Sequence, residues 1–168
     1  IRRGEFLPDV LQLSNGVVIN TPGADAKLEA NKVAYLNDFV TRLRFTTAYP
    51  AGMSAGTFVD TLNTNGGNPL SVAERNQLVA DLTGGQKTRA QVVRAVAEDS
   101  DLVSAEKNKA FVLMQYLGYL RRDPNSGQDT DYTGYDFWLR KLNEHGGDFH
   151  AAQMVRSFIV SGEYLGRF

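Results

Sequence analysis

The feature that most constrains the fold is an internal repeat. Three segments recur later in the chain in the same order. The pairs are QVVRAVAEDS with QMVRSFIVSG (residues 91–100 and 153–162), LNTNGG with LNEHGG (62–67 and 142–147) and, more loosely, FVTRLRF with FVLMQYL (39–45 and 111–117). Self-similarity of this kind indicates two copies of one structural unit. We therefore predict an arm over residues 1–23, a first helical unit over 24–100 and a second over 101–168.

Both copies carry the sequence signals of helices. Apolar residues recur at helical spacing over residues 24–47 and 102–121. The first copy has an extra helix between its halves, residues 71–82, and the second has an enlarged first loop. Two helix starts are marked by capping boxes, Ser71-x-x-Glu74 and Thr88-x-x-Gln91. Because short amphipathic helices are marginal alone, we expect the copies to pack together as one all-α globular domain.

The N-terminal arm lies outside the repeat. Its segment VLQLSNGVVIN contains Asn15-Gly16, which is typical of a two-residue hairpin turn. We therefore expect a short irregular or hairpin-like arm. Since the chain opens IRRGEFLPD, without Met and without a signal-peptide pattern, we interpret it as a processed product or a piece of a longer protein.

Composition excludes several classes of function. The chain has 168 residues, with 18 basic and 19 acidic side chains fairly well mixed and a net charge of −1. Such a balance gives no general attraction to nucleic acid or to an anionic membrane. With no cysteine, the chain has neither disulfides nor thiolate metal sites. No apolar run approaches the length of about 18 residues that membrane insertion needs.

The most suggestive stretch for chemistry is DPNSGQDTDYTGYDFW, residues 123–138. Four of its residues match positions one, three, five and six of a calcium-binding helix-loop-helix loop, namely Asp129, Asp131, Thr133 and Gly134. Position twelve, where such a loop has a bidentate glutamate, is Arg140. A different, irregular oxygen cage for calcium is conceivable from Asp123, Asn125, Asp129 and Asp131.

A second interpretation of the same stretch needs no metal, and we favour it. Thr133-x-x-Asp136 is a capping box, and Asp131 near the same helix start suits the helix dipole. The remaining residues then form a solvated acidic connector.

Other catalytic and metal-binding patterns are weak. His145 and His150 lie five residues apart, which is not the spacing of two ligands one helical turn apart, and we expect surface histidines. No nucleophile elbow is present, and no pair of carboxylates is singled out for hydrolysis. We therefore predict no enzymatic activity. Tyrosines near the acidic loop would suit a protein or glycan surface if they are partly exposed.

Several segments carry a family resemblance. The pattern FVLMQYLGYLRRDP, GYDFWLRKLN and AAQMVRSFIVSGEYLGRF resembles the bacterial domain-of-unknown-function family 4214. Its motif positions are filled by Arg122-Asp123-Pro124, Gly134, Phe137-Trp138 and Phe158–Tyr164. The ending SGEYLGRF is also similar to the linker domains of phycobilisomes. The whole stretch further resembles the C-terminal region of large secreted proteins from Acidobacteria-type bacteria. The resemblance implies a secreted or cell-surface setting and a structural or binding role, and it carries no catalytic residues.

These observations predict a non-enzymatic structural, assembly or adhesion module of an extracellular or cell-surface bacterial protein. Its expected partners are further copies of itself or neighbouring domains of the same polypeptide. The apolar arm is a candidate for strand-like exchange between subunits. The alternative is a calcium- or glycan-binding module centred on residues 123–136. A carboxylate-dependent hydrolase is a third hypothesis. No cofactor other than calcium is implied.

Overall fold

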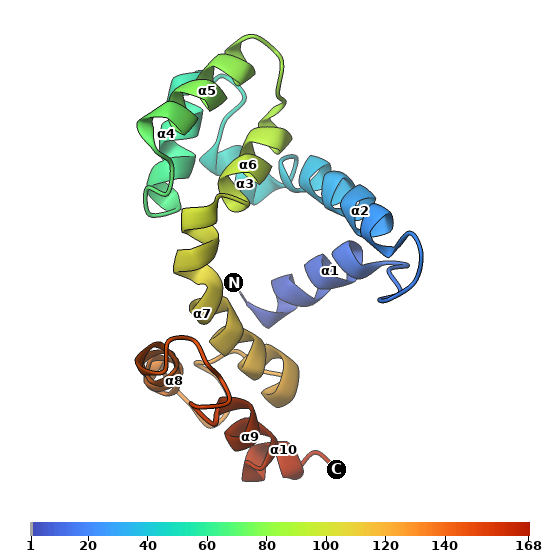
Figure 1. Cartoon of the computed structure of the whole chain (residues 1–168), viewed down its shortest axis with the longest axis vertical. Helices are drawn as coiled ribbons and strands as arrows, with labels where there is room; N and C mark the ends of the chain where they lie inside the picture. Colours follow the sequence, from blue (N-terminus) through green and yellow to red (C-terminus); the bar gives the residue numbers. More distant parts are fainter. Residues whose placement is uncertain (1) are drawn as a thin grey trace. The chain divides into compact units, whose positions relative to one another are not determined.

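The computed structural model describes residues 2–168, and within that range the regular structure is helical (Figure 1). No strand is present among these residues, which confirms the predicted all-α class. Nor does any helix in this range have the length and apolar character needed to span a bilayer. The elements are α1 (Arg3–Ser14), α2 (Ala24–Phe39), α3 (Leu43–Ala48), α4 (Ala55–Asn65), α5 (Val72–Thr83), α6 (Arg89–Ala97), α7 (Ser100–Gln115), the π-helical turn η1 (Tyr116–Leu120), α8 (Thr133–Glu144), α9 (Met154–Ile159) and α10 (Gly162–Leu165).

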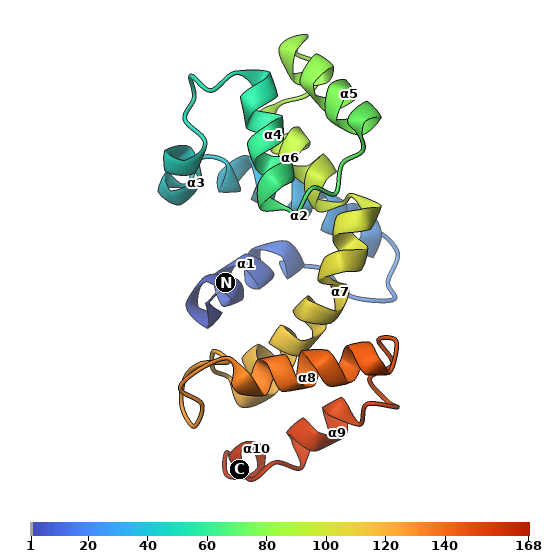
Figure 2. The same ribbon diagram turned by 90° about the vertical axis from the view of Figure 1, so that its left-hand side faces the viewer.

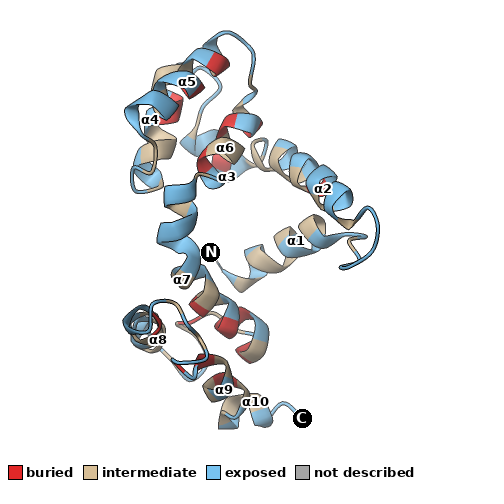
Figure 3. Ribbon diagram, in the orientation of Figure 1, coloured by how far each residue is buried: buried red, intermediate tan, exposed pale blue. Residues whose placement is uncertain are grey.

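The chain forms two compact units. The N-terminal unit is Leu7–Ser104, and the C-terminal unit is Ala105–Phe168 together with the residues up to Phe6. Each unit has its own hydrophobic core, and Figure 3 shows the buried residues in separate groups. The sequence places the division between residues 100 and 101, and in the structure it falls within α7, after Ser104.

The core of the N-terminal unit is rich in aromatic rings. Helices α4, α5 and α6 pack on one another, and α2 packs on α6. Phe58, Val59 and Val92 are fully buried where these helices meet. The ring of Phe45, in α3, meets that of Phe58, in α4, edge-on with centroids 6.3 Å apart. Close aromatic pairs add stabilisation beyond the burial of their area, so this contact anchors α3 to the core.

Two helices of the N-terminal unit begin at the predicted capping boxes. The Oγ of Ser71 accepts a hydrogen bond from the backbone N–H of Glu74 at 3.3 Å, and Oε2 of Glu74 accepts from the N–H of Ser71 at 2.8 Å. Thr88 and Gln91 form the same reciprocal pair at the start of α6, at 3.3 and 2.8 Å. Both predictions are confirmed, because each box satisfies N–H groups that a helix start leaves without partners.

The C-terminal unit has a second core, built from the end of α7 and from η1, α8 and α9 (Figure 2). Val112, Leu142 and Met154 are fully buried in it. The ring of Tyr116 meets that of Phe158 edge-on, with centroids 5.1 Å apart. Helices α9 and α10 both pack on η1, so the last segment of the chain closes this core.

The two copies of the repeat bury the same positions. In the segment shared by α6 and α9, Val92 aligns with Met154 and both are 0% exposed. Four residues later, Val96 aligns with Phe158 and both are 4% exposed. The repeated sequence therefore corresponds to a helix that presents the same face to the core in each unit.

The repeated Gly-Gly pairs also have a common backbone role. Gly67, after α4, has φ of +84°, and Gly147, after α8, has φ of +85°. This left-handed conformation is accessible to glycine without a steric cost, and it ends a helix by turning the chain. Both copies of the repeat therefore turn the chain after this helix at a glycine of left-handed conformation.

The predicted hairpin in the arm is wrong. Residues 3–14 form helix α1, and Gly16, with φ of +68°, follows its end. An Asn-Gly pair is as suitable for a helix end as for a hairpin turn, since both need a positive φ. The Nδ2 of Asn31, from α2, donates to the carbonyls of Leu13 and Asn15 at 2.9 and 2.8 Å. Those contacts satisfy carbonyls that the end of α1 leaves without helical partners.

The helix expected over residues 24–47 is also interrupted. Helix α2 ends at Phe39 and α3 begins at Leu43. The hydroxyl of Thr41 donates to the carbonyl of Asp38 at 2.6 Å, a local bond that competes with helix continuation. Arg42 is extended there, with ψ of 141°, and its guanidinium lies 2.8 Å from the carboxylate of Asp9.

Candidate functional site

The acidic stretch does not gather its four predicted calcium ligands. The first two, Asp123 and Asn125, contact the start of the chain. Oδ1 of Asp123 accepts from the backbone N–H of Arg3 at 2.6 Å, and Oδ1 of Asn125 accepts from Nη1 of Arg2 at 2.7 Å. These two side chains therefore hold Arg2 and Arg3, at the start of α1.

The other two predicted ligands have separate partners. Oδ2 of Asp129 lies 2.6 Å from Nη2 of Arg122. Oδ1 of Asp131 accepts from the backbone N–H of Thr133 at 2.8 Å, and this hydrogen bond lowers the pKa of Asp131. Asp131 thus performs the role expected of the Thr133-x-x-Asp136 box, which does not form because α8 already includes Thr133. The predicted capping box at Thr133 is therefore wrong, and the side chain that caps the start of α8 is that of Asp131, two residues earlier.

Across residues 2–168 the structure places no group of three or more His, Asp or Glu side chains where they would hold a metal ion. The two histidines are both exposed, as expected. Between them, Oδ1 of Asp148 accepts from the backbone N–H groups of His150 and Ala151 at 2.8 and 3.1 Å. This carboxylate caps a turn, and that contact lowers its pKa.

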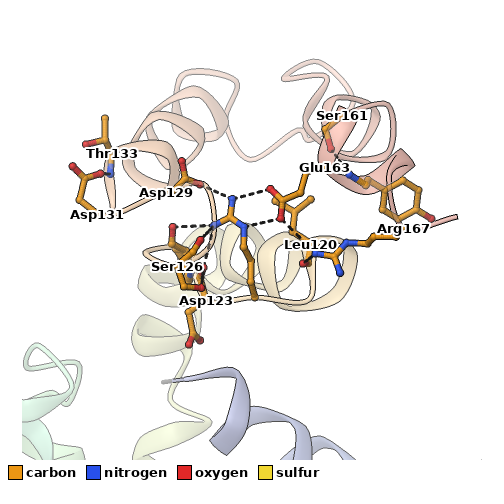
Figure 4. A network of polar contacts seen from close by, with 12 residues as sticks. Leu120, Asp123, Ser126, Asp129, Asp131, Thr133, Ser161, Glu163 and Arg167 are labelled. Atoms are coloured by element: carbon orange, nitrogen blue, oxygen red, sulfur yellow. Dashed lines mark hydrogen bonds and ion pairs between the residues drawn. The ribbon is translucent and has the colours of Figure 1, made fainter.

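The structure instead assembles a polar site around Arg122. Figure 4 labels its partners Ser126, Asp129 and Glu163. Its Nε lies 2.8 Å from Oε1 of Glu163, and its Nη2 lies 3.0 Å from Oε2 of Glu163 and 2.6 Å from Oδ2 of Asp129. Its Nη1 donates to the backbone carbonyls of Asp123, Pro124 and Ser126.

The Arg122 side chain is only 11% exposed. Burial alone would lower the pKa of Arg122, but the two carboxylates outweigh that effect and raise the pKa. The guanidinium carbon also lies 5.3 Å from the centre of the Tyr116 ring, a cation–π contact. The guanidinium is therefore a fixed, fully engaged structural cation.

The backbone around Arg122 explains how it is positioned. Arg121 ends η1 in the left-handed conformation, with φ of +50°, and this turns the chain back toward the core. Gly127, with φ of +72°, lets the loop fold closely over the arginine, since an added Cβ would lie 2.9 Å from Cδ of Arg122. The carbonyls of the loop thereby converge on Nη1.

Beside this network lies a cavity of about 430 Å³. Its walls come from η1, the acidic loop, α8, α9 and α10, all within the C-terminal unit. A π-helical turn such as η1 is frequently found at functional sites. The lining residues are Tyr116, Leu120, Arg122, Gln128, Asp129, Gly134, Trp138, Ser157, Phe158, Ser161, Gly162 and Glu163.

Tyr116 is the most distinctive residue of the cavity. It is 3% exposed, and its hydroxyl has no hydrogen-bond partner among residues 2–168. Burial, reinforced by the charge of Asp129, raises the pKa of Tyr116 to about 12. A Cβ added at Gly134 would lie 2.8 Å from this hydroxyl, so α8 approaches closely because its second residue is glycine.

The sequence pattern pointed to the acidic residues of the loop as candidate ligands, and it gave no indication that Arg122 lies at the centre of the site. Arg122 and Glu163 lie within the RDP and SGEY motifs of the family resemblance, which marked their positions and no role for them. Comparison of the chain with family models, curated proteins and solved structures finds no match. The candidate site therefore rests on its geometry.

Proposed function

We propose that this chain is a non-enzymatic structural module that associates with further copies of itself within an extracellular or cell-surface bacterial protein. The observation that carries the proposal is a set of exposed apolar side chains near the end of α1 and in the turn between α1 and α2. Figure 1 shows this turn as the loop that joins the two helices. Leu11, Val18 and Ile19 are all exposed, and Ile19 is 80% exposed. Exposed apolar groups of this kind are typical of protein–protein contacts.

The turn presents Val18 and Ile19 on a fixed backbone, and Leu11 lies in α1. Asn31 holds the carbonyls on both sides of Ser14, and Val17 is half-buried. The hydroxyl of Thr21 donates to the carbonyl of Val18 at 2.7 Å. A surface that is already ordered loses little conformational entropy on binding, which favours association.

The charge of the chain supports a second copy as the partner. At a net charge of −1, two copies repel each other only weakly, and proteins near zero net charge are prone to associate. The resemblance to the domain-of-unknown-function family 4214 and to the C-terminal regions of large secreted proteins supports the extracellular setting and the structural role.

Light scattering on a sizing column, over a range of chain concentrations, tests the proposal. The wild type should have a mass above that of one chain, and the double variant Val18→Asp/Ile19→Asp should shift toward the single-chain mass. Val72→Asp is the matched control, since Val72 is 78% exposed in the first turn of α5, a position that accepts a negative charge.

A wild type that stays at the mass of one chain at every concentration contradicts the proposal. So does a double variant whose mass equals that of the wild type. Point substitutions are preferable to removing residues 1–20, because Arg2 and Arg3 also contact the acidic loop of the C-terminal unit. Removal of residues 1–20 would therefore delete both the exposed apolar side chains and the contacts of Arg2 and Arg3 with the acidic loop.

A further inference from the structure

We propose that the cavity beside Arg122 binds a neutral, hydroxyl-rich ligand, a single sugar unit of a carbohydrate. The cavity, of about 430 Å³, lies at the lower end of the range of about 300–1,000 Å³ that is usual for small-molecule sites. The proposal does not depend on self-association, since the cavity lies within the C-terminal unit and the turn that carries Ile19 belongs to the other unit.

The charges around the cavity favour a neutral ligand. Glu163 contacts both Arg122 and Arg167, and Asp129 contacts Arg122, so two cations balance two carboxylates. All five N–H groups of the Arg122 guanidinium are directed at protein oxygens. No guanidinium donor is left for a phosphate or carboxylate ligand, although such anions are the usual partners of arginine.

The polar groups that remain suit hydroxyls. The hydroxyl of Tyr116 has no hydrogen-bond partner among residues 2–168, and the same holds for the side-chain amide of Gln128 and for Oδ1 of Asp129. The phenol and the amide each both donate and accept, and the carboxylate oxygen accepts. A ligand hydroxyl also donates and accepts, so neighbouring hydroxyls on one ring match this set.

Part of the cavity wall is apolar and aromatic. Trp138 and Phe158 contribute it, with ring centroids 5.5 Å apart, together with Leu120, and Ser157 and Ser161 also line the cavity. An apolar wall with a few convergent polar groups is the usual composition of a small-molecule site. A sugar ring combines hydroxyls at its edge with C–H groups on its faces, and so it is complementary to both parts of this cavity.

Trp138 is the single tryptophan of the chain and lines the cavity, so its fluorescence reports binding directly. The chain is titrated separately with glucose, galactose and mannose, and with sulfate as an anionic probe. We expect a saturable change in fluorescence with at least one sugar, at a Kd in the range of about 1–10 mM. Sulfate should cause no saturable change.

Two variants locate the binding. Tyr116→Phe removes only the hydroxyl, and Gln128→Ala changes an exposed side chain without hydrogen bonds, so neither should prevent folding. Each should weaken sugar binding about two- to tenfold, the effect of one lost hydrogen bond. Tyr119→Phe, the matched control on η1, removes the hydroxyl of a tyrosine that does not line the cavity and should bind as the wild type does.

Three results overturn the proposal. The first is the lack of any response to the three sugars at about 100 mM, where even weak sites saturate. The second is sugar binding that neither variant at Tyr116 or Gln128 weakens. The third is saturable sulfate binding that displaces the sugar, which would identify an anion site. None of these results alters the mass of the chain, so the failure of this proposal is distinct from the failure of assembly.

Discussion

Arg122 and Glu163 stand 41 positions apart in the sequence and form a two-point ion pair, with Nε 2.8 Å from Oε1 and Nη2 3.0 Å from Oε2. The pair joins the second residue after η1 to α10. Two parallel hydrogen bonds between a guanidinium and a carboxylate fix distance and orientation together, as a lysine could not. This pair therefore holds the C-terminal segment against the rest of its unit.

Replacing Arg122 with alanine should destabilise the C-terminal unit by about 2–4 kcal/mol, because two carboxylates and three carbonyls lose a buried donor. Urea unfolding followed by Trp138 fluorescence measures the loss, since this tryptophan lies in the same unit. Arg140→Ala is the control. Arg140 is 69% exposed and 3.9 Å from Glu144, so its loss should cost less than about 0.5 kcal/mol. Equal costs for the two variants would contradict the assigned role of Arg122.

Calcium should leave the melting temperature of the chain unchanged, because Asp129 and Asp131 already have partners in Arg122 and the N–H of Thr133. Scanning calorimetry in calcium and in chelator measures the difference. A bound ion at 100 times its Kd would add about 2.7 kcal/mol, which corresponds to several degrees. Such a shift, abolished by Asp129→Asn, would show that the loop rearranges to form the cage.

Alkaline pH should reveal the burial of Tyr116. Its pKa is raised to about 12, against an ordinary value near 10, so the folded state holds the proton more tightly than the unfolded chain does. The resulting stability is complete below about pH 10 and is lost as pH rises from 10 toward 12. The Tyr116→Phe variant has no ionisable group at this position. Between pH 9 and 11 its free energy of unfolding, measured in urea, should therefore fall by about 1 kcal/mol less than that of the wild type.

Tyr132→Phe is the control for that experiment, because Tyr132 is exposed. Its stability should fall with pH as that of the wild type does. If the stabilities of Tyr116→Phe and the wild type fall in parallel over the same range, folding does not raise the pKa of Tyr116. That result would contradict the effect assigned to burial of its side chain.

The two repeat glycines should respond differently to alanine. At Gly67 an added Cβ meets nothing within 4 Å, so the substitution costs only the strain of a positive φ, about 1–2 kcal/mol. At Gly147 the Cβ would also lie 3.0 Å from Oδ1 of Asn108, so the cost should be larger. Thermal unfolding compares them with Gly52→Ala, at an open site without positive φ, which should change little. A Gly67→Ala protein as stable as the wild type would contradict this account.

The helices could be predicted from the sequence where their signals are local. A capping box depends on residues three positions apart, and those at Ser71 and Thr88 formed as expected. The same signal failed at Thr133, because Asp131 caps the helix from two residues earlier. The Asn15-Gly16 pair failed for a related reason, since one backbone conformation serves both a hairpin and a helix end.

The candidate site could not be predicted in the same way. The partners of Asp129 and Glu163 depend on where Arg122 points, and that direction depends on the left-handed Arg121 and on the π-helical turn before it. Neither feature has a local sequence signal. The acidic composition of the loop suggested a cation at its centre, and in the structure that cation is a side chain of the protein.

The π-helical turn η1 has a consequence for how the C-terminal unit tolerates change. Each residue of a regular α-helix advances the next by about 100° around the axis, so the phase of everything downstream depends on the number of residues before it. Within η1, Gly118 has nothing within 4 Å of the position of an added Cβ, so alanine is accommodated there. The wider π-helical turn holds one residue more than an α-helical turn does. Deleting Gly118 would therefore convert η1 to an α-helical turn, whereas Gly118→Ala would leave the turn that precedes Arg122 unchanged.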